Sequence, residues 1–298
     1  MPTTYNAGAP SVNPTGATTH HVCVYSGFFE CRRTSGQSAA APCSRGDRAG
    51  IASFSASARR NFLKKIFSLS ALPSFFSTLT YPAYYPADAN TWKRHLDRFS
   101  RVLLRRFPHA WFFWKLEPQR RGAPHFHLMG DLACGAVSVA LLRCFVAATW
   151  FRVVGSGDGR HAVAGTQFDF IHDATGKVRA YVCKYVGKPA GSDLPEWARP
   201  GRFWGIVGRK NLPAAPCVHL LLPKDIYFRL RRVVRKWLAR LASPASAGYA
   251  VRLKKMPSFF VLAPHELLFR FLESAAGFTV RAPGPLLPDV LELELIPF

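Results

Sequence analysis

Two apolar stretches joined by a short polar turn constrain the fold of this chain more than any other feature. Trp111 to Glu117 and His125 to Gly130 are rich in aromatic and aliphatic side chains, and the turn sequence QRRGAP lies between them. This pattern predicts an antiparallel hairpin. Similar stretches predict three further strands: Phe75 to Tyr81, Thr166 to Ile171, and an edge strand within Gly201 to Arg209.

The hairpin also predicts which side chains meet. With a register centred on Arg121, Glu117 lies opposite His125, and Lys115 lies opposite His127. Alternation along the strands then places Glu117, His125 and His127 on one face of the sheet. Two imidazoles and one carboxylate leave open positions on an octahedral ion, which suits Mg²⁺ or Mn²⁺ holding a phosphate oxygen. The alternative is a strand with two surface histidines, because two histidines at this spacing are by themselves a weak signal.

Helical periodicity marks several segments around these strands, with apolar residues on one side and basic residues on the other. The predicted apolar stripes are Trp92, Leu96, Phe99 and Leu103 in one segment and Leu230, Val233, Trp237 and Leu241 in another. We expect a flexible N-terminal arm over residues 1–48, a central domain over 49–215, and a basic helical extension over 216–298. The expected helices are the segment after Ser55, Thr91 to Arg106, Gly135 to Phe151, Lys224 to Leu241 and Pro264 to Ala275, with a loop over Gly155 to Gly165.

The charge balance points to a polyanionic partner. The 298 residues include 40 Lys and Arg against 17 Asp and Glu, a formal net charge of +23. Nucleic acid is the first candidate for such a partner and an anionic membrane surface the second. No long uncharged apolar run predicts a transmembrane helix, and no signal-peptide pattern opens the chain, so we expect a cytoplasmic location.

The seven cysteines are scattered and odd in number, which is typical of reduced thiols in a cytoplasm. Cys23, Cys31 and Cys43 lie near His20 and His21 in the sequence, but their spacing fits no compact zinc-binding pattern. The sequence also has no phosphate-binding loop of the kind found in ATP-driven motors. Zinc binding by these cysteines and histidines therefore stays an alternative, and nothing in the sequence suggests an ATP-driven motor.

The stretch YVCKYVGK contains the second group of candidate site residues. On a helix, Tyr181 and Tyr185 lie four residues apart on one face, and Lys184 and Lys188 each follow a tyrosine by three. A phenol with a pKa near ~10 is a poor nucleophile at neutral pH. A nearby cation and a metal on the target phosphate would ease its attack. The alternative is an ordinary amphipathic helix with two half-buried tyrosines.

These motifs together resemble those of HUH endonucleases, the initiators of rolling-circle DNA replication. PHFHLM resembles the His-hydrophobe-His motif of that family, and Glu117 matches the usual third metal ligand on the preceding strand. FFSTLTYP resembles the first family motif, and YVCKYVGK resembles the two-tyrosine motif of initiators from small single-stranded DNA phages and some plasmids. The resemblance covers roughly residues 51 to 210.

The resemblance implies an α+β fold, with a central antiparallel sheet and flanking helices. It implies metal-dependent nicking and joining of single-stranded DNA at a replication origin, through a 5′-phosphotyrosine, in the cytoplasm of a bacterial host. A host helicase and polymerase are then the expected partners. Alternatives are a related HUH transposase or relaxase, a phosphodiesterase that acts through water, and a non-catalytic single-stranded DNA-binding protein.

Overall fold

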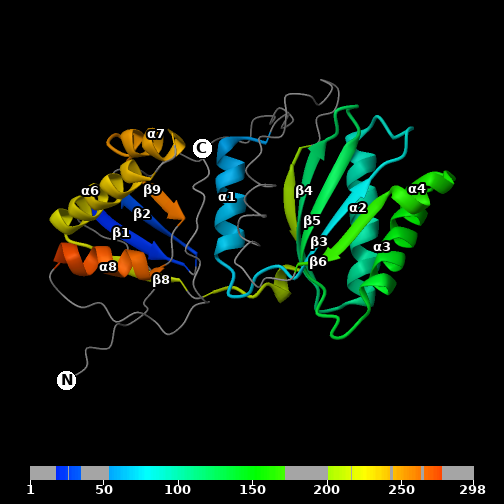
Figure 1. Ribbon diagram of the computed structural model, residues 1–298, viewed down its shortest axis with the longest axis horizontal. Coiled ribbons are helices and arrows are strands. Elements are labelled where there is room, and N and C mark those ends of the chain that lie inside the picture. The colour runs from blue at the N-terminus through cyan, green and yellow to red at the C-terminus, as the bar shows by residue number, and fades with distance from the viewer. Residues whose placement is uncertain are drawn as a thin grey trace. The chain divides into compact units, whose positions relative to one another are not determined.

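Figure 1 shows the computed structural model of the chain, an α+β protein with two antiparallel sheets. The chain divides into two compact units, which we call the four-stranded unit and the five-stranded unit after their sheets. The first consists of Met1–Gly46, Lys64–Ser70 and Ala214–Phe298, and the second of Asp47–Leu63 and Ala71–Pro213. The structure describes residues 18–25, 27–34, 54–171, 201–215, 217–241, 244–262 and 265–276.

The sheet of the five-stranded unit has the order β6-β3-β5-β4-β7, and every neighbouring pair is antiparallel. The predicted hairpin is confirmed to the residue, because Glu117 pairs with His125 and Lys115 with His127. The predicted edge strand is confirmed as β7. The strands are β3 (Phe75–Thr80), β4 (Trp111–Pro118), β5 (Pro124–Asp131), β6 (Thr166–Phe170) and β7 (Trp204–Val207).

Helices α2 (Ala89–Arg106) and α3 (Val139–Val154) lie on one side of this sheet in Figure 1. The predicted apolar stripe of α2 is buried, as are Val146 and Trp150 of α3. On the other face, Phe62 of α1 (Ala56–Phe67) stacks on Trp204 at 4.8 Å between ring centroids. A short 3₁₀ turn, η1, covers Arg209–Asn211.

The loop predicted over residues 155–165 is wrong, because it contains helix α4 (Gly159–Ala164). The Asp158 side chain caps this helix by accepting a 2.9 Å hydrogen bond from the Arg160 amide. The glycines on either side of the helix suggested a loop, whereas an N-terminal cap of this kind favours a turn of helix.

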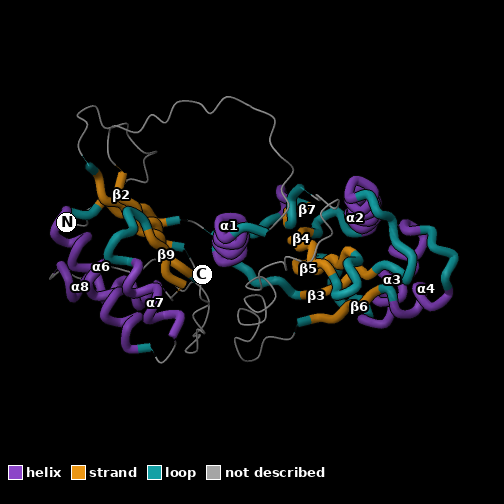
Figure 2. Tube along the Cα trace, turned by 90° about the horizontal axis from the view of Figure 1, so that it is seen from above, coloured by secondary structure: helices purple, strands orange, loops and turns teal. Residues whose placement is uncertain are grey.

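The sheet of the four-stranded unit has the order β8-β1-β2-β9, and helices cover one of its faces (Figure 2). Val22, Val24 and Cys31 from its strands pack with Leu230 and Leu268 from these helices in one buried core. Its elements are β1 (Thr19–Val24), β2 (Phe28–Thr34), β8 (Val218–Leu221), α6 (Lys224–Arg240), α7 (Pro244–Arg252), β9 (Phe259–Leu262) and α8 (His265–Ala276).

Two predictions about the ends of the chain need correction. The flexible arm over residues 1–48 is wrong for 19–34, which form β1 and β2. The extension over 216–298 contains strands β8 and β9 as well as helices. None of the helices in the described part of the chain is long and apolar enough to cross a membrane.

The predicted apolar stripe of α6 is also out of phase. The sequence suggested Leu230, Val233, Trp237 and Leu241, but the buried residues of the helix are Ile226, Tyr227, Leu230, Val234 and Leu238. Apolar residues stand side by side at 233–234 and 237–238, so periodicity alone does not choose between the two stripes.

Candidate active site

The hairpin of β4 and β5 brings the three predicted metal ligands to one face of the five-stranded sheet. Glu117 Oε2 lies 3.2 Å from His127 Nε2, and the rings of His125 and His127 are 4.6 Å apart between centroids. Phe126, which lies between the two histidines, points to the opposite face and contacts Trp150 of α3, with ring centroids 6.4 Å apart. The ligand candidates therefore lie on the face away from α3.

Thr80, the last residue of β3, orients His125. Its Oγ1 lies 2.9 Å from His125 Nδ1, and the two residues pair across β3 and β5. The Thr80 carbonyl accepts hydrogen bonds from Trp150 Nε1 at 2.8 Å and from His161 Nε2 at 2.9 Å. These contacts fix Thr80, and because Nδ1 of His125 is bonded to Thr80, Nε2 is the ring nitrogen that would bind a metal. Sequence reasoning found the threonine-containing strand, but not this contact, which depends on the β3–β5 register.

Lys115 is a buried cation beside the candidate ligands. Its side chain is fully buried, with Nζ 3.3 Å from Glu117 Oε2 and 5.5 Å from the centre of the Phe54 ring. Burial acts to raise the pKa of Glu117, but the hydrogen bond from His127 and the charge of Lys115 outweigh it and lower this pKa to about 2. Glu117 is therefore a carboxylate at neutral pH. The sequence placed Lys115 opposite His127 but gave it no role.

Burial, with a smaller contribution from His127, lowers the pKa of His125 to about 4 against the opposing effect of Glu117. His125 is therefore neutral at pH 7, which is the form that binds metals. The donor set fits a hard divalent cation. In the described structure, the three residues do not offer ligand atoms that all lie within 4.8 Å of one another. To hold one ion, Glu117 would have to exchange its contact with His127 for the ion.

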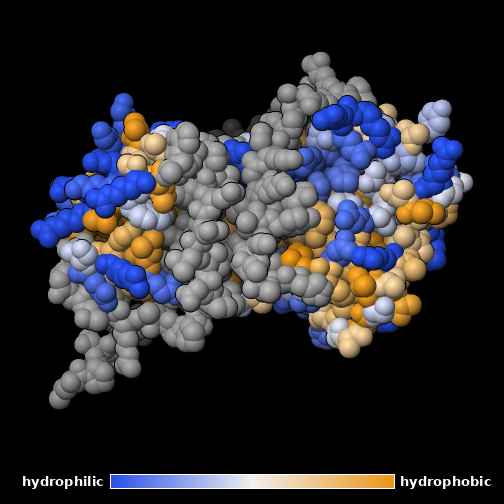
Figure 3. Space-filling view, viewed as in Figure 1, coloured by the Kyte–Doolittle hydropathy of each residue, from blue (hydrophilic) through white to orange (hydrophobic). Residues whose placement is uncertain are grey.

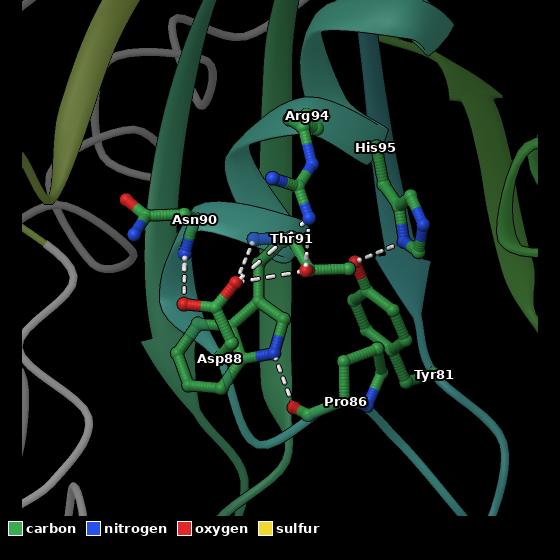
Figure 4. A network of polar contacts seen from close by, with 8 residues as sticks. Tyr81, Pro86, Asp88, Asn90, Thr91, Arg94 and His95 are labelled. Atoms are coloured by element: carbon green, nitrogen blue, oxygen red, sulfur yellow. Dashed lines mark hydrogen bonds and ion pairs between the residues drawn. The ribbon is translucent and has the colours of Figure 1, made fainter.

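The connection from β3 to α2 is tied to the hairpin on one side and to the helix on the other. Arg121, at the hairpin turn, donates hydrogen bonds to the three carbonyls of residues 81–83. Figure 4 shows Tyr81 and His95 in contact, with Tyr81 Oη 3.0 Å from His95 Nδ1. In the same view, Asp88 caps α2 by accepting hydrogen bonds from two backbone amides. These contacts hold the end of β3, and with it Thr80, in place.

The four residues predicted from the tyrosine motif, Tyr181, Lys184, Tyr185 and Lys188, lie outside the residues that the structure describes. The structure therefore places the metal-ligand candidates, and the tyrosine and lysine roles stay predictions.

The stretch that contains the site is similar to known replication proteins. Residues 74–190 match the model of a family described as "Replication-associated protein ORF2/G2P". The chain is similar to a phage replication protein. It is 26% identical over 231 residues to the replication-associated protein G2P of Pseudomonas phage Pf3, which covers 72% of this chain and 78% of that protein. No solved structure gives a significant match.

The family match begins at the residue before β3 and ends after the tyrosine motif. It therefore contains the three metal-ligand candidates, Thr80, Lys115 and both predicted tyrosines. The four-stranded unit lies wholly outside the matched stretch, because none of its three segments falls between residues 74 and 190.

Proposed function

We propose that this protein initiates rolling-circle DNA replication by nicking and rejoining single-stranded DNA at an origin. One observation carries the proposal: Glu117, His125 and His127 meet on one sheet face, within the stretch that matches a family of replication-associated proteins. A purely DNA-binding protein has no need of an ionised carboxylate beside two imidazoles on a braced hairpin.

Glu117, His125 and His127 are the residues that would hold Mg²⁺ or Mn²⁺. When bound, such an ion polarises a phosphate oxygen and stabilises the charge that builds up on it. Glu117 supplies a charged ligand at neutral pH, and the neutral ring of His125 supplies an uncharged one. Thr80 orients His125, and the hydrogen bond from His127 and the charge of Lys115 together keep Glu117 ionised.

In the proposed reaction, a tyrosine oxygen attacks the phosphorus of a phosphodiester. A bond forms between the tyrosine oxygen and phosphorus, the bond from phosphorus to the 3′ oxygen breaks, the tyrosine proton leaves, and the 3′ oxygen takes up a proton. The products are a 5′-phosphotyrosine and a 3′ hydroxyl that primes synthesis. Rejoining reverses these steps, so the cycle consumes neither water nor a nucleoside triphosphate. Lys184 and Lys188 would each place a cation near one tyrosine.

Two tyrosines suit a cycle in which the origin is regenerated while the first tyrosine is still joined to DNA. A second nucleophile is then needed to cut the new copy, and Tyr181 and Tyr185 would alternate in this role. The competing hypothesis makes Tyr185 the sole nucleophile and Tyr181 a residue that packs or stacks on DNA. A host helicase and polymerase would extend the 3′ end.

The basic surface supplies the affinity for DNA in this proposal. On the face that Figure 3 shows, hydrophilic residues lie beside hydrophobic ones on both units. Contacts of basic side chains with phosphates release counterions, so binding should weaken steeply as salt rises. Exposed basic residues form rows on two helices: Arg94, Arg98, Arg101 and Arg105 on α2, and Arg229, Arg232, Lys236 and Arg240 on α6.

The test is a search for a covalent protein–DNA adduct on a denaturing gel, after incubation with a single-stranded oligonucleotide and Mg²⁺ or Mn²⁺. If the tyrosines alternate, Tyr181→Phe and Tyr185→Phe each still form an adduct, and only the double variant forms none. If Tyr185→Phe alone removes every adduct while Tyr181→Phe behaves as wild type, there is a single nucleophile.

The same gel separates the other candidate functions. Cleavage without an adduct would indicate a phosphodiesterase that acts through water, and binding without cleavage would indicate a non-catalytic single-stranded DNA-binding protein. An HUH transposase or relaxase would also form an adduct. Adduct formation on the replication origin of the DNA that carries this gene distinguishes an initiator from these relatives.

A further inference from the structure

A second cluster of possible metal ligands lies in the four-stranded unit, apart from the residues of the proposed nicking site. Cys23, Cys217 and His219 each offer one ligand atom, and the three atoms all lie within 4.8 Å of one another. Cys23 Sγ is 3.3 Å from His219 Nδ1. Zinc bonds of about 2.0–2.3 Å to nitrogen and sulfur put the corners of a tetrahedral site about 3.3–3.8 Å apart, so this cluster is near the required size.

The backbone sets these side chains in place. Cys23 of β1 pairs directly with His219 of β8. Cys217 precedes His219 by two residues, which is the spacing that keeps two side chains of an extended chain on one face. The neighbours of Cys23 on β1, Val22 and Val24, belong to the core beneath the helices, so Cys23 points to the opposite face of the sheet.

This cluster could not be predicted from the spacing of the cysteines in the sequence. Cys31 is part of the apolar core on the helical face, and Cys43 lies outside the described residues. The partners of Cys23 lie far from it in the sequence, with His219 196 residues away. Only the antiparallel pairing of β1 with β8 brings them together.

We propose that Cys23, Cys217 and His219 bind a zinc ion that fastens β1 to β8. Two thiolates and one imidazole suit Zn²⁺, and they suit Mg²⁺ or Mn²⁺ poorly, because those ions prefer oxygen ligands. The two proposed metal sites thus differ in their ligands, because only the second contains sulfur. Three protein ligands leave a fourth position on the zinc for water or another donor.

The zinc ion would have a structural effect that the nicking site does not require. It would cross-link two strands that are far apart in the sequence, β1 and β8, and binding free energy at such a site adds to folding free energy. We therefore expect zinc to raise the unfolding temperature of the four-stranded unit and to leave that of the five-stranded unit unchanged.

The test uses Co²⁺ as a spectroscopic probe of the full-length protein, kept reduced with a phosphine and first stripped with a chelator. We expect one equivalent of Co²⁺ to give a thiolate-to-cobalt charge-transfer band in the near ultraviolet, and one equivalent of Zn²⁺ to remove it. Cys23→Ser and Cys217→Ser should abolish the band. His219→Gln, a change at an exposed side chain, should weaken Co²⁺ binding at least tenfold without unfolding the protein.

Two control variants separate this site from the rest of the molecule. Cys144→Ser removes an exposed thiol of the five-stranded unit and should leave the band unchanged. His127→Ala removes a ligand of the proposed nicking site, which contains no sulfur, so the band should persist even if nicking is lost. Failure of one proposal therefore does not imply failure of the other.

Three results would overturn the zinc proposal. One is a charge-transfer band that persists in Cys217→Ser. Another is wild-type protein that binds no equivalent of Zn²⁺ when fully reduced. The third is a Zn²⁺-dependent rise in unfolding temperature that is equal in wild type and in His219→Gln.

Discussion

The two sheets of this protein are assembled from the chain in opposite ways. The five strands of one sheet follow one another between Phe75 and Val207, and its central hairpin joins β4 to β5 through a short turn. The other sheet pairs β1 and β2, near the start of the chain, with β8 and β9, near its end. Closing such a long loop costs more conformational entropy than closing a hairpin. The second sheet therefore depends more on its core and on any cross-link between its strands.

The two sheets also carry different kinds of polar side chain. The five-stranded sheet carries an ionised carboxylate, two imidazoles and a buried lysine on one face, an arrangement suited to phosphate chemistry. The four-stranded sheet carries two thiols and an imidazole at the pairing of strands distant in sequence. We therefore propose that the five-stranded unit carries the chemistry and that the four-stranded unit supports stability and DNA binding.

The largest effect that tests this division is loss of nicking in His127→Ala. We expect cleavage of a single-stranded oligonucleotide to fall at least about a hundredfold, because a metal ligand is lost. DNA affinity should change little, since basic residues supply it. His109→Ala, a change at an exposed histidine of the same unit, serves as the control and should nick normally. Wild-type cleavage by His127→Ala, or by wild-type protein in chelator, would break the assignment.

A matched pair of glycine variants compares the stability of the two units. A Cβ at Gly130 would lie 2.1 Å from the Trp111 carbonyl oxygen, so Gly130→Ala should destabilise the five-stranded unit by about 3 kcal/mol. At Gly248, in α7, the nearest atom is 3.7 Å away, so Gly248→Ala should stabilise the four-stranded unit by about 0.5–1 kcal/mol. Urea unfolding followed by hydrogen exchange of each unit checks both values. Equal effects on both units would mean that they unfold as one.

The contribution of each unit to DNA binding can be measured with two triple variants. Arg229, Arg232 and Lys236 to Gln on α6 should reduce the slope of log affinity against log salt by up to about 2, since each single-strand phosphate contact contributes about 0.7. Arg98, Arg101 and Arg105 to Gln on α2 make the matched change in the other unit. An unchanged slope in the α6 variant would limit that unit to a structural role.

The smallest expected effect is a change in how stability depends on pH. Burial lowers the pKa of His95 in one unit and of His20 in the other, with neighbouring positive charges adding to the shift. An unfolded histidine has a pKa near ~6.5, so the unfolded chain binds protons first and stability should fall as pH drops below this value. His95→Gln should reduce this loss in the five-stranded unit alone, and His20→Gln in the four-stranded unit alone. Unfolding temperatures measured between about pH 7 and pH 5 check this.

The sequence predicted the five-stranded sheet well because its strongest signals are local. The turn at Arg121 sets the register of β4 and β5, and that register alone brings Glu117 to the histidines. The contact between Thr80 and His125 was not predictable in the same way, because it depends on pairing between β3 and β5, which are not joined by a turn.

The sequence did not predict the four-stranded sheet, because this sheet also depends on pairing between strands that are not joined by a turn. The flanks of β1 and β2 are rich in small and polar residues, so these strands suggested apolar islands in a flexible arm. Each is paired with a strand of only four residues, β8 or β9, from the far end of the chain. Short strands of this kind have little periodicity of their own, and only tertiary packing stabilises them.

Pairing between the first and last strands has a consequence for how the protein is made. All strands of the five-stranded sheet have been synthesised once the ribosome has passed residue 207. The partners of β1 and β2, β8 and β9, are synthesised only after that point. At about 5–20 residues per second, β1 leaves the ribosome on the order of ten seconds or more before its partner β8. During that interval the edges of the β1–β2 hairpin are unpaired and available to other chains. A chain that ended at residue 213 would contain the proposed metal ligands and tyrosines but would lack β8 and β9. The edges of its β1–β2 hairpin would stay unpaired and could pair with strands of other chains.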